Sequence, residues 1–202
     1  MTSQLESREA AYRDAMIGGR IKLLLLFLVC AAPVIASYLT FYVIKPEGRV
    51  NYGTLIEPPR PLPDVTLNQL DGTPFKLGAL KGKWVLLTFD RAACEGACAE
   101  KLYMMRQVRT MQGKERDRLE RAWLITDANQ LQTQTIREYD GMKMLRAVDS
   151  PMAREFPAAA DRADHIYLLD PLGNLIMRYP KNADPKKMHK DLGRLLKYSR
   201  IG

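Results

Sequence analysis

The fold is decided by the stretch Trp84-Val-Leu-Leu-Thr-Phe89, which is followed at once by Asp-Arg-Ala-Ala-Cys94-Glu-Gly-Ala-Cys98. The nearly continuous apolar run predicts a central strand that is buried on both faces. After the cysteines, apolar residues recur at helical spacing at Leu102, Met105 and Val108, which predicts a helix. The two thiols therefore lie at a strand-to-helix turn, where they can either exchange electrons with another thiol pair or hold a soft metal ion.

The rest of the chain alternates between strand and helix signals. We expect short strands at 65–67 and 74–77, joined by an Asp-Gly turn, further strands at 122–126, 143–148, 165–169 and 174–179, and helices at 131–139 and 185–198. Alternation that closes on an antiparallel pair predicts an α/β sandwich with a mixed central sheet. A dithiol at the end of the first strand–helix unit is typical of a thioredoxin-like fold.

An uncharged stretch at 23–44 precedes this domain. It is long enough to cross a bilayer core of roughly 30 Å as a helix. The lead before it, residues 1–22, contains Glu6, Glu9 and Asp14, and it is longer than the short basic lead of a removable signal peptide. The sequence therefore predicts an uncleaved transmembrane anchor at 23–44.

The flanks of the anchor predict its orientation. The balance of basic residues favours the N-terminal segment 1–22 in the cytoplasm. Residues 45–61 contain four prolines and are expected to form an extended, semi-rigid linker. The thioredoxin-like domain at 62–202 would then face the periplasm from a bacterial inner membrane, in a compartment where disulfides form.

The formal net charge of +8 does not choose between nucleic acid, an anionic membrane and an acidic protein as a partner. Nucleic acid is not expected, because the sequence has no zinc-finger spacing and no aromatic-rich RNA motif. The basic side of the helix at 185–198 is expected to face solvent, with an acidic partner or anionic lipid as the alternative.

His165 stands just before a predicted strand. A histidine in this position is either structural or a ligand. Two thiolates and an imidazole suit copper, because sulfur favours Cu(I) and imidazole accepts both oxidation states. A closed zinc site needs a fourth ligand, and the sequence offers no convincing one.

Several motifs in order resemble the Sco/SenC proteins, which are membrane-anchored, thioredoxin-like factors that assemble the copper centre of cytochrome c oxidase. They are Pro63-Asp-Val-Thr-Leu, Asp71-Gly-Thr-Pro-Phe-Lys-Leu, Leu80-Lys-Gly-Lys-Trp-Val-Leu-Leu-Thr-Phe, Cys-x3-Cys and Asp164-His165…Leu168-Leu-Asp-Pro-Leu-Gly. The resemblance implies that Cys94, Cys98 and His165 bind a copper ion, and that Asp127 matches an acidic position associated with redox chemistry. It also implies a partner, which is the copper-receiving subunit of cytochrome c oxidase or another redox or copper protein.

The sequence departs from the family pattern in places, such as Glu95 where the family usually has a proline. Three hypotheses therefore stay open. The first is a copper-binding assembly factor. The second is a thiol–disulfide oxidoreductase, in which Cys94 attacks because it is nearer the helix start, Cys98 resolves the mixed disulfide and His165 is dispensable. The third is an interaction domain with a structural disulfide.

Overall fold

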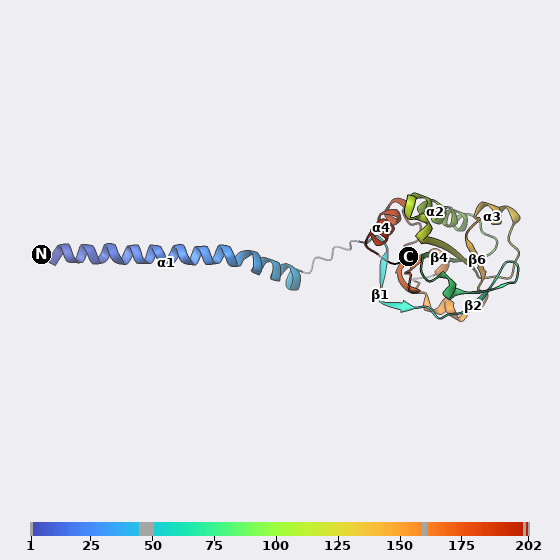
Figure 1. Cartoon of the computed structure of the whole chain (residues 1–202), viewed down its shortest axis with the longest axis horizontal. Coiled ribbons are helices and arrows are strands. Elements are labelled where there is room, and N and C mark those ends of the chain that lie inside the picture. Colours follow the sequence, from blue (N-terminus) through green and yellow to red (C-terminus); the bar gives the residue numbers. More distant parts are fainter. Residues whose placement is uncertain (1, 45–50, 159–160, 200, 202) are drawn as a thin grey trace. The chain divides into compact units, whose positions relative to one another are not determined.

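The computed structural model describes residues 2–44, 51–158, 161–199 and 201, and the chain forms two units, Met1–Arg49 and Val50–Gly202. The first unit is helix α1 (Thr2–Leu39), which continues as the π-helical turn η1 (Thr40–Ile44) (Figure 1). Among the described residues, its segment Arg20–Val43 is the one stretch long and apolar enough to cross a membrane, by length and composition alone. This segment agrees with the predicted anchor at 23–44.

The second unit is built on a mixed eight-stranded sheet with the strand order β1-β8-β7-β4-β5-β6-β2-β3. Its strands are β1 (Thr54–Pro61), β2 (Thr66–Gln69), β3 (Pro74–Lys76), β4 (Trp84–Asp90), β5 (Leu119–Ile125), β6 (Lys143–Arg146), β7 (Ile166–Leu169) and β8 (Asn174–Arg178). The central strand β4 is parallel to β5 and antiparallel to β7. The predicted thioredoxin-like sandwich with a mixed sheet is therefore confirmed.

The helices of this unit are α2 (Ala97–Met111), α3 (Thr133–Glu138) and α4 (Pro185–Tyr198). Short 3₁₀ turns connect the elements: η2 (Leu77–Leu80), η3 (Gly113–Arg118), η4 (Pro151–Glu155) and η5 (Arg162–Asp164). Helices α2 and α4 lie together on one side of the sheet (Figure 1). Ser150 followed by a proline is a sequence pattern typical of a helix start, but Pro151–Glu155 forms only the 3₁₀ turn η4 and no α-helix.

Two hydrophobic clusters fill the two sides of the sheet. The cluster beneath α2 and α4, here the helix-side cluster, contains Leu86 and Trp123, whereas the opposite cluster contains Leu87 and Phe89. Successive side chains of a strand point to opposite faces. Strand β4 contributes to both clusters, which explains why its whole run had to be apolar.

The structure corrects the prediction that residues 45–61 are all linker. Residues 54–61 form the edge strand β1, in which Thr54 lies opposite Arg178 of β8. Prolines are tolerated there because an edge strand leaves one row of backbone groups without ladder partners. The register shifts between Leu55 and Arg60, across the consecutive prolines. Residues 45–50 of the predicted linker lie outside the described residues.

Tyr167 should make the fold sensitive to alkali. It is wholly buried, and its hydroxyl donates to the Pro157 carbonyl oxygen at 2.9 Å. Burial raises the pKa of Tyr167 to about 12 from its usual value near 10. Above pH 10 the unfolded chain ionises this phenol first, so its contribution to stability is complete below pH 10 and is lost as the pH rises through 12.

We therefore expect the free energy of unfolding to fall between pH 10 and 12, by at most about 1.4 kcal/mol per pH unit from this tyrosine. Urea denaturation of the wild type and Tyr167→Phe at pH 8, 10 and 11 measures the difference. The variant keeps every lysine, so their titration cancels in the comparison. An equally steep fall in both proteins would contradict the role of Tyr167.

Candidate redox site

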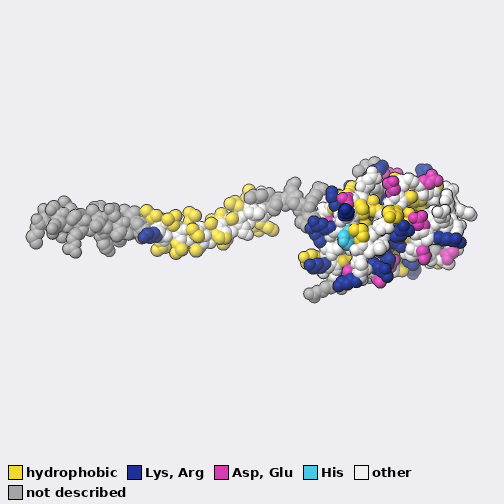
Figure 2. Space-filling model, turned by 90° about the horizontal axis from the view of Figure 1, so that it is seen from above, with side chains coloured by type: hydrophobic (Ala, Val, Ile, Leu, Met, Phe, Trp, Pro, Cys, Tyr) yellow, Lys and Arg dark blue, Asp and Glu magenta, His cyan; other side chains and the backbone are white. Residues whose placement is uncertain are grey.

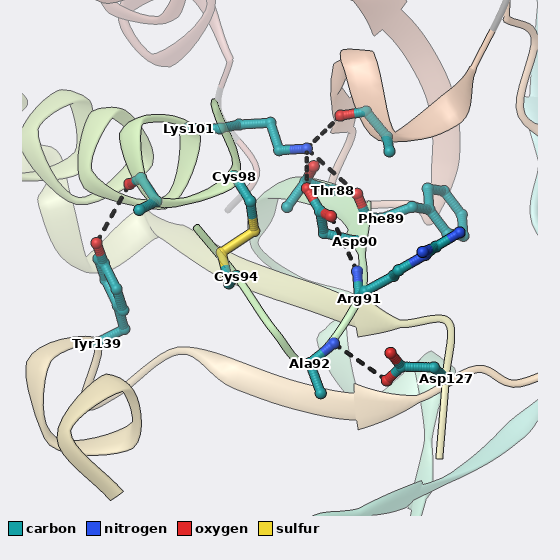
Figure 3. Close-up of a disulfide and its surroundings, with 12 residues drawn as sticks. Thr88, Phe89, Asp90, Arg91, Ala92, Cys94, Cys98, Lys101, Asp127 and Tyr139 are labelled. Atoms are coloured by element: carbon teal, nitrogen blue, oxygen red, sulfur yellow. Dashed lines mark hydrogen bonds and ion pairs between the residues drawn. A yellow bond between two sulfur atoms is a disulfide. The ribbon is translucent and has the colours of Figure 1, made fainter. Parts of the chain in front are cut away.

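A disulfide joins Cys94 and Cys98 across the turn between β4 and α2 (Figure 3), with their Cα atoms 5.1 Å apart. Gly96 lies between the cysteines with a φ of +51°, a left-handed conformation that glycine adopts without strain. The chain can therefore turn tightly enough for Cys98 to enter the first turn of α2. The predicted placement of the pair at a strand-to-helix turn is correct.

The two sulfur-bearing residues differ in exposure. Cys98 is 6% exposed and packs in the helix-side cluster, whereas Cys94 is half-buried at its edge. Helix α2 begins at Ala97, so Cys98 and not Cys94 is nearer the helix start. The reason given for Cys94 as the attacking thiol was therefore wrong, but its greater exposure supports the same assignment.

Lys101 is a residue of this site that the sequence reasoning missed. It lies one turn after Cys98 in α2 and is 8% exposed. Its ammonium forms an ion pair with Asp90 Oδ2 at 2.9 Å and donates to the carbonyl oxygens of Phe89 and Ala163 (Figure 3). A single buried cation thus joins the end of β4, helix α2 and the turn η5 beside the disulfide.

Asp127 follows β5 and supports the cysteine loop. Its Oδ1 accepts the backbone N–H of Ala92, two residues before Cys94, at 3.1 Å (Figure 3). Its Oδ2 accepts from the side chain of Asn129 at 3.1 Å. The carboxylate is half-buried. These contacts make Asp127 a positioning residue for the loop that carries Cys94.

His165 lies between η5 and β7, and it is 7% exposed. Its Nδ1 lies 2.9 Å from the carbonyl oxygen of Tyr179, so this nitrogen carries the proton and donates. The backbone at His165 is extended, with φ −121° and ψ 152°. Ile166 packs in the helix-side cluster with Cys98, whereas the His165 ring lies 6.1 Å from the Tyr167 ring, which belongs to the opposite cluster.

The imidazole and Cys98 therefore face opposite sides of the sheet. Within 20–43 and the described parts of the folded domain, no group of three or more His, Cys, Asp and Glu side chains is placed to hold a metal ion. The ligand set of Cys94, Cys98 and His165 stays a prediction. In the disulfide form of the protein these residues do not fit a copper ion, because the sulfurs bond each other and the His165 ring lies beside Tyr167 on the opposite side of the sheet.

A cavity of about 500 Å³ opens beside the disulfide. Cys98, Lys101 and Met104 line it from one side, and Ala163, Asp164, Ile166 and residues 180–183 from the other. Lys181 donates to Asp164 at 2.8 Å at its rim. This hydrogen bond lowers the pKa of Asp164 and raises the pKa of Lys181. The cavity is thus lined by both apolar and charged groups and reaches the buried cysteine.

Known proteins of similar structure combine this fold with copper or thiol chemistry. ScoI of Bradyrhizobium japonicum, solved with copper bound, is 20% identical with a TM-score of 0.52, and the match covers 66% of this chain and 98% of that one. Yeast Sco1 with copper bound is 20% identical with a TM-score of 0.57, covering 70% and 95%. The thioredoxin domain of a thiol-disulfide oxidoreductase from Bacteroides vulgatus is 17% identical with a TM-score of 0.50, covering 67% and 94%.

Because the sequence identities are low, these structural similarities establish the fold alone. The shared fold confirms that part of the resemblance to the Sco/SenC proteins. A search of curated proteins finds no match. A family described as "Transmembrane-like, thioredoxin-like, C-terminal domain" matches residues 84–199, from the first residue of β4 to just beyond α4. Because this match spans more than half of the sequence, the chain belongs to the transmembrane-like, thioredoxin-like C-terminal domain family.

Proposed function

We propose that this protein is a membrane-anchored thiol–disulfide oxidoreductase that reduces the metal-site cysteines of a copper or redox protein. The observation that carries the proposal is the Cys94–Cys98 disulfide at the strand-to-helix turn of a thioredoxin-like sheet, with one cysteine half-buried and the other buried beside a cavity. A purely structural bridge would not need one accessible sulfur and a space beside the pair.

The reaction follows ordinary thiol–disulfide exchange. In the reduced protein the Cys94 thiolate attacks one sulfur of the target disulfide, and a mixed disulfide forms while the other target sulfur leaves as a thiolate. The Cys98 thiolate then attacks Cys94 Sγ and releases the second target sulfur. Two electrons have passed to the target, each target thiolate takes a proton, and the Cys94–Cys98 disulfide is restored. A donor dithiol must reduce it again before the next cycle.

The structure supports separate roles for the cysteines. A target disulfide is bulky, so the first attack needs the more exposed sulfur, which Cys94 provides. The second attack occurs within the protein, so Cys98 can remain buried in the first turn of α2. Asp127 holds the Ala92 amide and so keeps the Cys94 loop in place for both steps.

The proposed location is a bacterial inner membrane, with the folded domain in the periplasm. The helical segment Arg20–Val43 supports an anchor. A disulfide supports an oxidising compartment for the domain, since thiols are kept reduced in the cytosol. The excess of basic residues before the anchor supports a cytoplasmic N-terminus.

Copper delivery is the second candidate function, favoured by the shared fold with ScoI and yeast Sco1, both solved with copper bound. Copper would be the cargo, held by Cys94, Cys98 and His165 and passed to the copper-receiving subunit of cytochrome c oxidase. Two changes would have to precede binding: reduction of the disulfide, and movement of the His165 ring to the side of the sheet on which Cys98 lies. Thiol exchange needs only the first of these.

The thiol roles predict a specific trapped species. In the full-length protein carrying Cys30→Ser, which removes the third thiol, Cys98→Ser is expected to accumulate a mixed disulfide through Cys94 with a peptide that contains an oxidised cysteine pair. Cys94→Ser is expected to trap little or none. Intact-protein mass spectrometry after acid quenching measures both adducts. The reverse pattern would exchange the roles, and a wild-type pair inert to exchange would reject the proposed function.

Copper titration separates the two candidates. For a thiol reductant, the reduced His165→Ala variant is expected to exchange thiols at the wild-type rate and to bind Cu(I) no differently from His189→Ala, a control on the basic helix. For a copper carrier, the reduced wild type binds one equivalent of Cu(I), and both His165→Ala and Cys98→Ser lose it. Metal analysis after gel filtration gives the stoichiometry.

A further inference from the structure

Helix α4 presents a surface of cations with no exposed carboxylate of its own. The α4 basic face is defined here by its exposed lysines, Lys186, Lys187, Lys190 and Lys197. The one carboxylate within the helix, Asp191, is 2% exposed and points into the domain. Figure 2 shows many lysine and arginine side chains on the visible face of the domain, with aspartate and glutamate side chains among them. Nothing within α4 therefore neutralises this face.

Exposed apolar side chains border the C-terminal end of the same helix. Tyr198 is 79% exposed, Leu172 in the β7–β8 turn is 62% exposed, and Ile201 is 53% exposed. Together with Asn51 they help to line a largely apolar hollow of about 470 Å³. Cations beside exposed aliphatic and aromatic groups are the composition of surfaces that lie in the interfacial region of a bilayer.

The chain enters the folded domain at α4. The Asp191 carboxylate accepts the backbone N–H groups of Tyr52 at 2.8 Å and Gly53 at 2.9 Å. The Tyr52 hydroxyl accepts the N–H of Asp184, the residue that caps α4, at 3.0 Å. The Lys187 ammonium lies 5.3 Å from the centre of the Tyr52 ring. Residue 52 is therefore fixed to the N-terminal half of α4.

The length of chain before residue 52 limits how far α4 can be from the anchor. Helix α1 and its π-helical continuation end at Ile44. Even fully extended, the eight steps from residue 44 to residue 52 span at most about 28 Å. The attraction between a lysine and an anionic bilayer acts within about 8 Å at physiological salt. The tether thus allows the α4 basic face to reach the bilayer surface.

We propose that the α4 basic face, together with Leu172, Tyr198 and Ile201, is a docking surface for the anionic lipid headgroups of the membrane that holds the anchor. The inference rests on the membrane anchoring in the proposed function and on no step of the thiol chemistry. The lysines contact headgroup phosphates, and the apolar side chains enter the interface beside them. The docked face would limit the orientations in which the Cys94–Cys98 site meets its target.

Vesicle binding tests this surface on the domain 51–202, which contains the whole sheet and both core clusters. The domain is expected to sediment with vesicles of phosphatidylglycerol and phosphatidylcholine and to dissociate from them as the salt concentration rises. It is expected not to bind vesicles of phosphatidylcholine alone. Lys186→Gln with Lys190→Gln is expected to weaken binding about 25-fold, from roughly fivefold per lysine near a charged bilayer. Adding Tyr198→Ala to this double variant should weaken vesicle binding further, without changing how the affinity depends on salt concentration.

A charge-matched pair controls for net charge. Lys76→Gln with Lys143→Gln removes the same two charges from β3 and β6, at the far end of the strand order from β1 and β8. This pair should retain nearly all of the affinity. The docking surface would be overturned if the two double variants lost equal affinity for anionic vesicles, or if the wild-type domain did not bind these vesicles. The thiol exchange assay uses no lipid, so its outcome is independent of this result.

Discussion

Lys101→Met is expected to lower the free energy of unfolding by about 3 kcal/mol. The Lys101 side chain is only 10% exposed, and its ammonium joins Asp90 to two backbone carbonyl oxygens. Removal of one partner leaves a poorly solvated carboxylate without its cation, which costs about 3–5 kcal/mol in fully buried pairs. The partial exposure of Asp90, 19%, places the expected loss at the lower end. Urea denaturation at pH 7 measures it.

Lys83→Met is the matched control. Lys83 pairs with Glu120 at 3.0 Å, almost the same distance, but its side chain is 47% exposed. Exposed ion pairs contribute less than about 1 kcal/mol, so Lys83→Met should lower the free energy of unfolding only slightly. Because Lys101 also holds η5 beside the cysteine loop, Lys101→Met should speed the reduction of Cys94–Cys98 by a small dithiol. Equal losses of stability in the two variants would show that Lys101 acts as an ordinary surface cation.

Asp191→Ala is expected to lower the free energy of unfolding by about 3 kcal/mol. One buried carboxylate oxygen accepts the N–H groups of Tyr52 and Gly53, and each buried donor left without a partner costs about 1–3 kcal/mol. Hydrogen exchange at these two amides should accelerate more than exchange in β4. Thermal or urea denaturation gives the stability, and amide exchange by NMR locates the effect.

Asp184→Ala provides the comparison for this prediction. Asp184 also accepts two backbone N–H groups, those of Lys186 and Lys187, but it does so at the exposed start of α4. Loss of such a cap costs about 1 kcal/mol. If Asp191→Ala cost no more than Asp184→Ala, water would be reaching the amides at residues 52 and 53, and the chain would not be locked to α4 as described.

The parts of the fold that could be predicted from sequence are those with strong local patterns. The apolar run of β4 and the periodic stripe of α2 each specify their own element. Strand β1 could not be found in this way, because its partner is β8, more than a hundred residues later, and its prolines are typical of linkers. Only the long-range pairing shows that this proline-rich segment belongs to the sheet.

The candidate site was predictable for the cysteines and less so for its neighbours. Lys101 did leave a signal, because it stands in the inward stripe that contains Cys98, Leu102 and Met105. A lysine there must find buried partners, and it does. The side on which His165 lies follows from alternation: once Ile166 points toward the cysteines, an extended residue before it points away. That argument requires the exact start of β7, which sequence patterns do not fix.

The two edges of the sheet have a consequence for proteins held at high density on a bilayer. Edge strand β1 contains Pro58, Pro59 and Pro61, and the opposite edge strand β3 has only three residues, the first of them a proline. Proline lacks the N–H that strand pairing requires. Neither border can therefore template a long hydrogen-bonded ladder with a neighbouring copy. Molecules confined to two dimensions can collide edge to edge without polymerising into a continuous sheet.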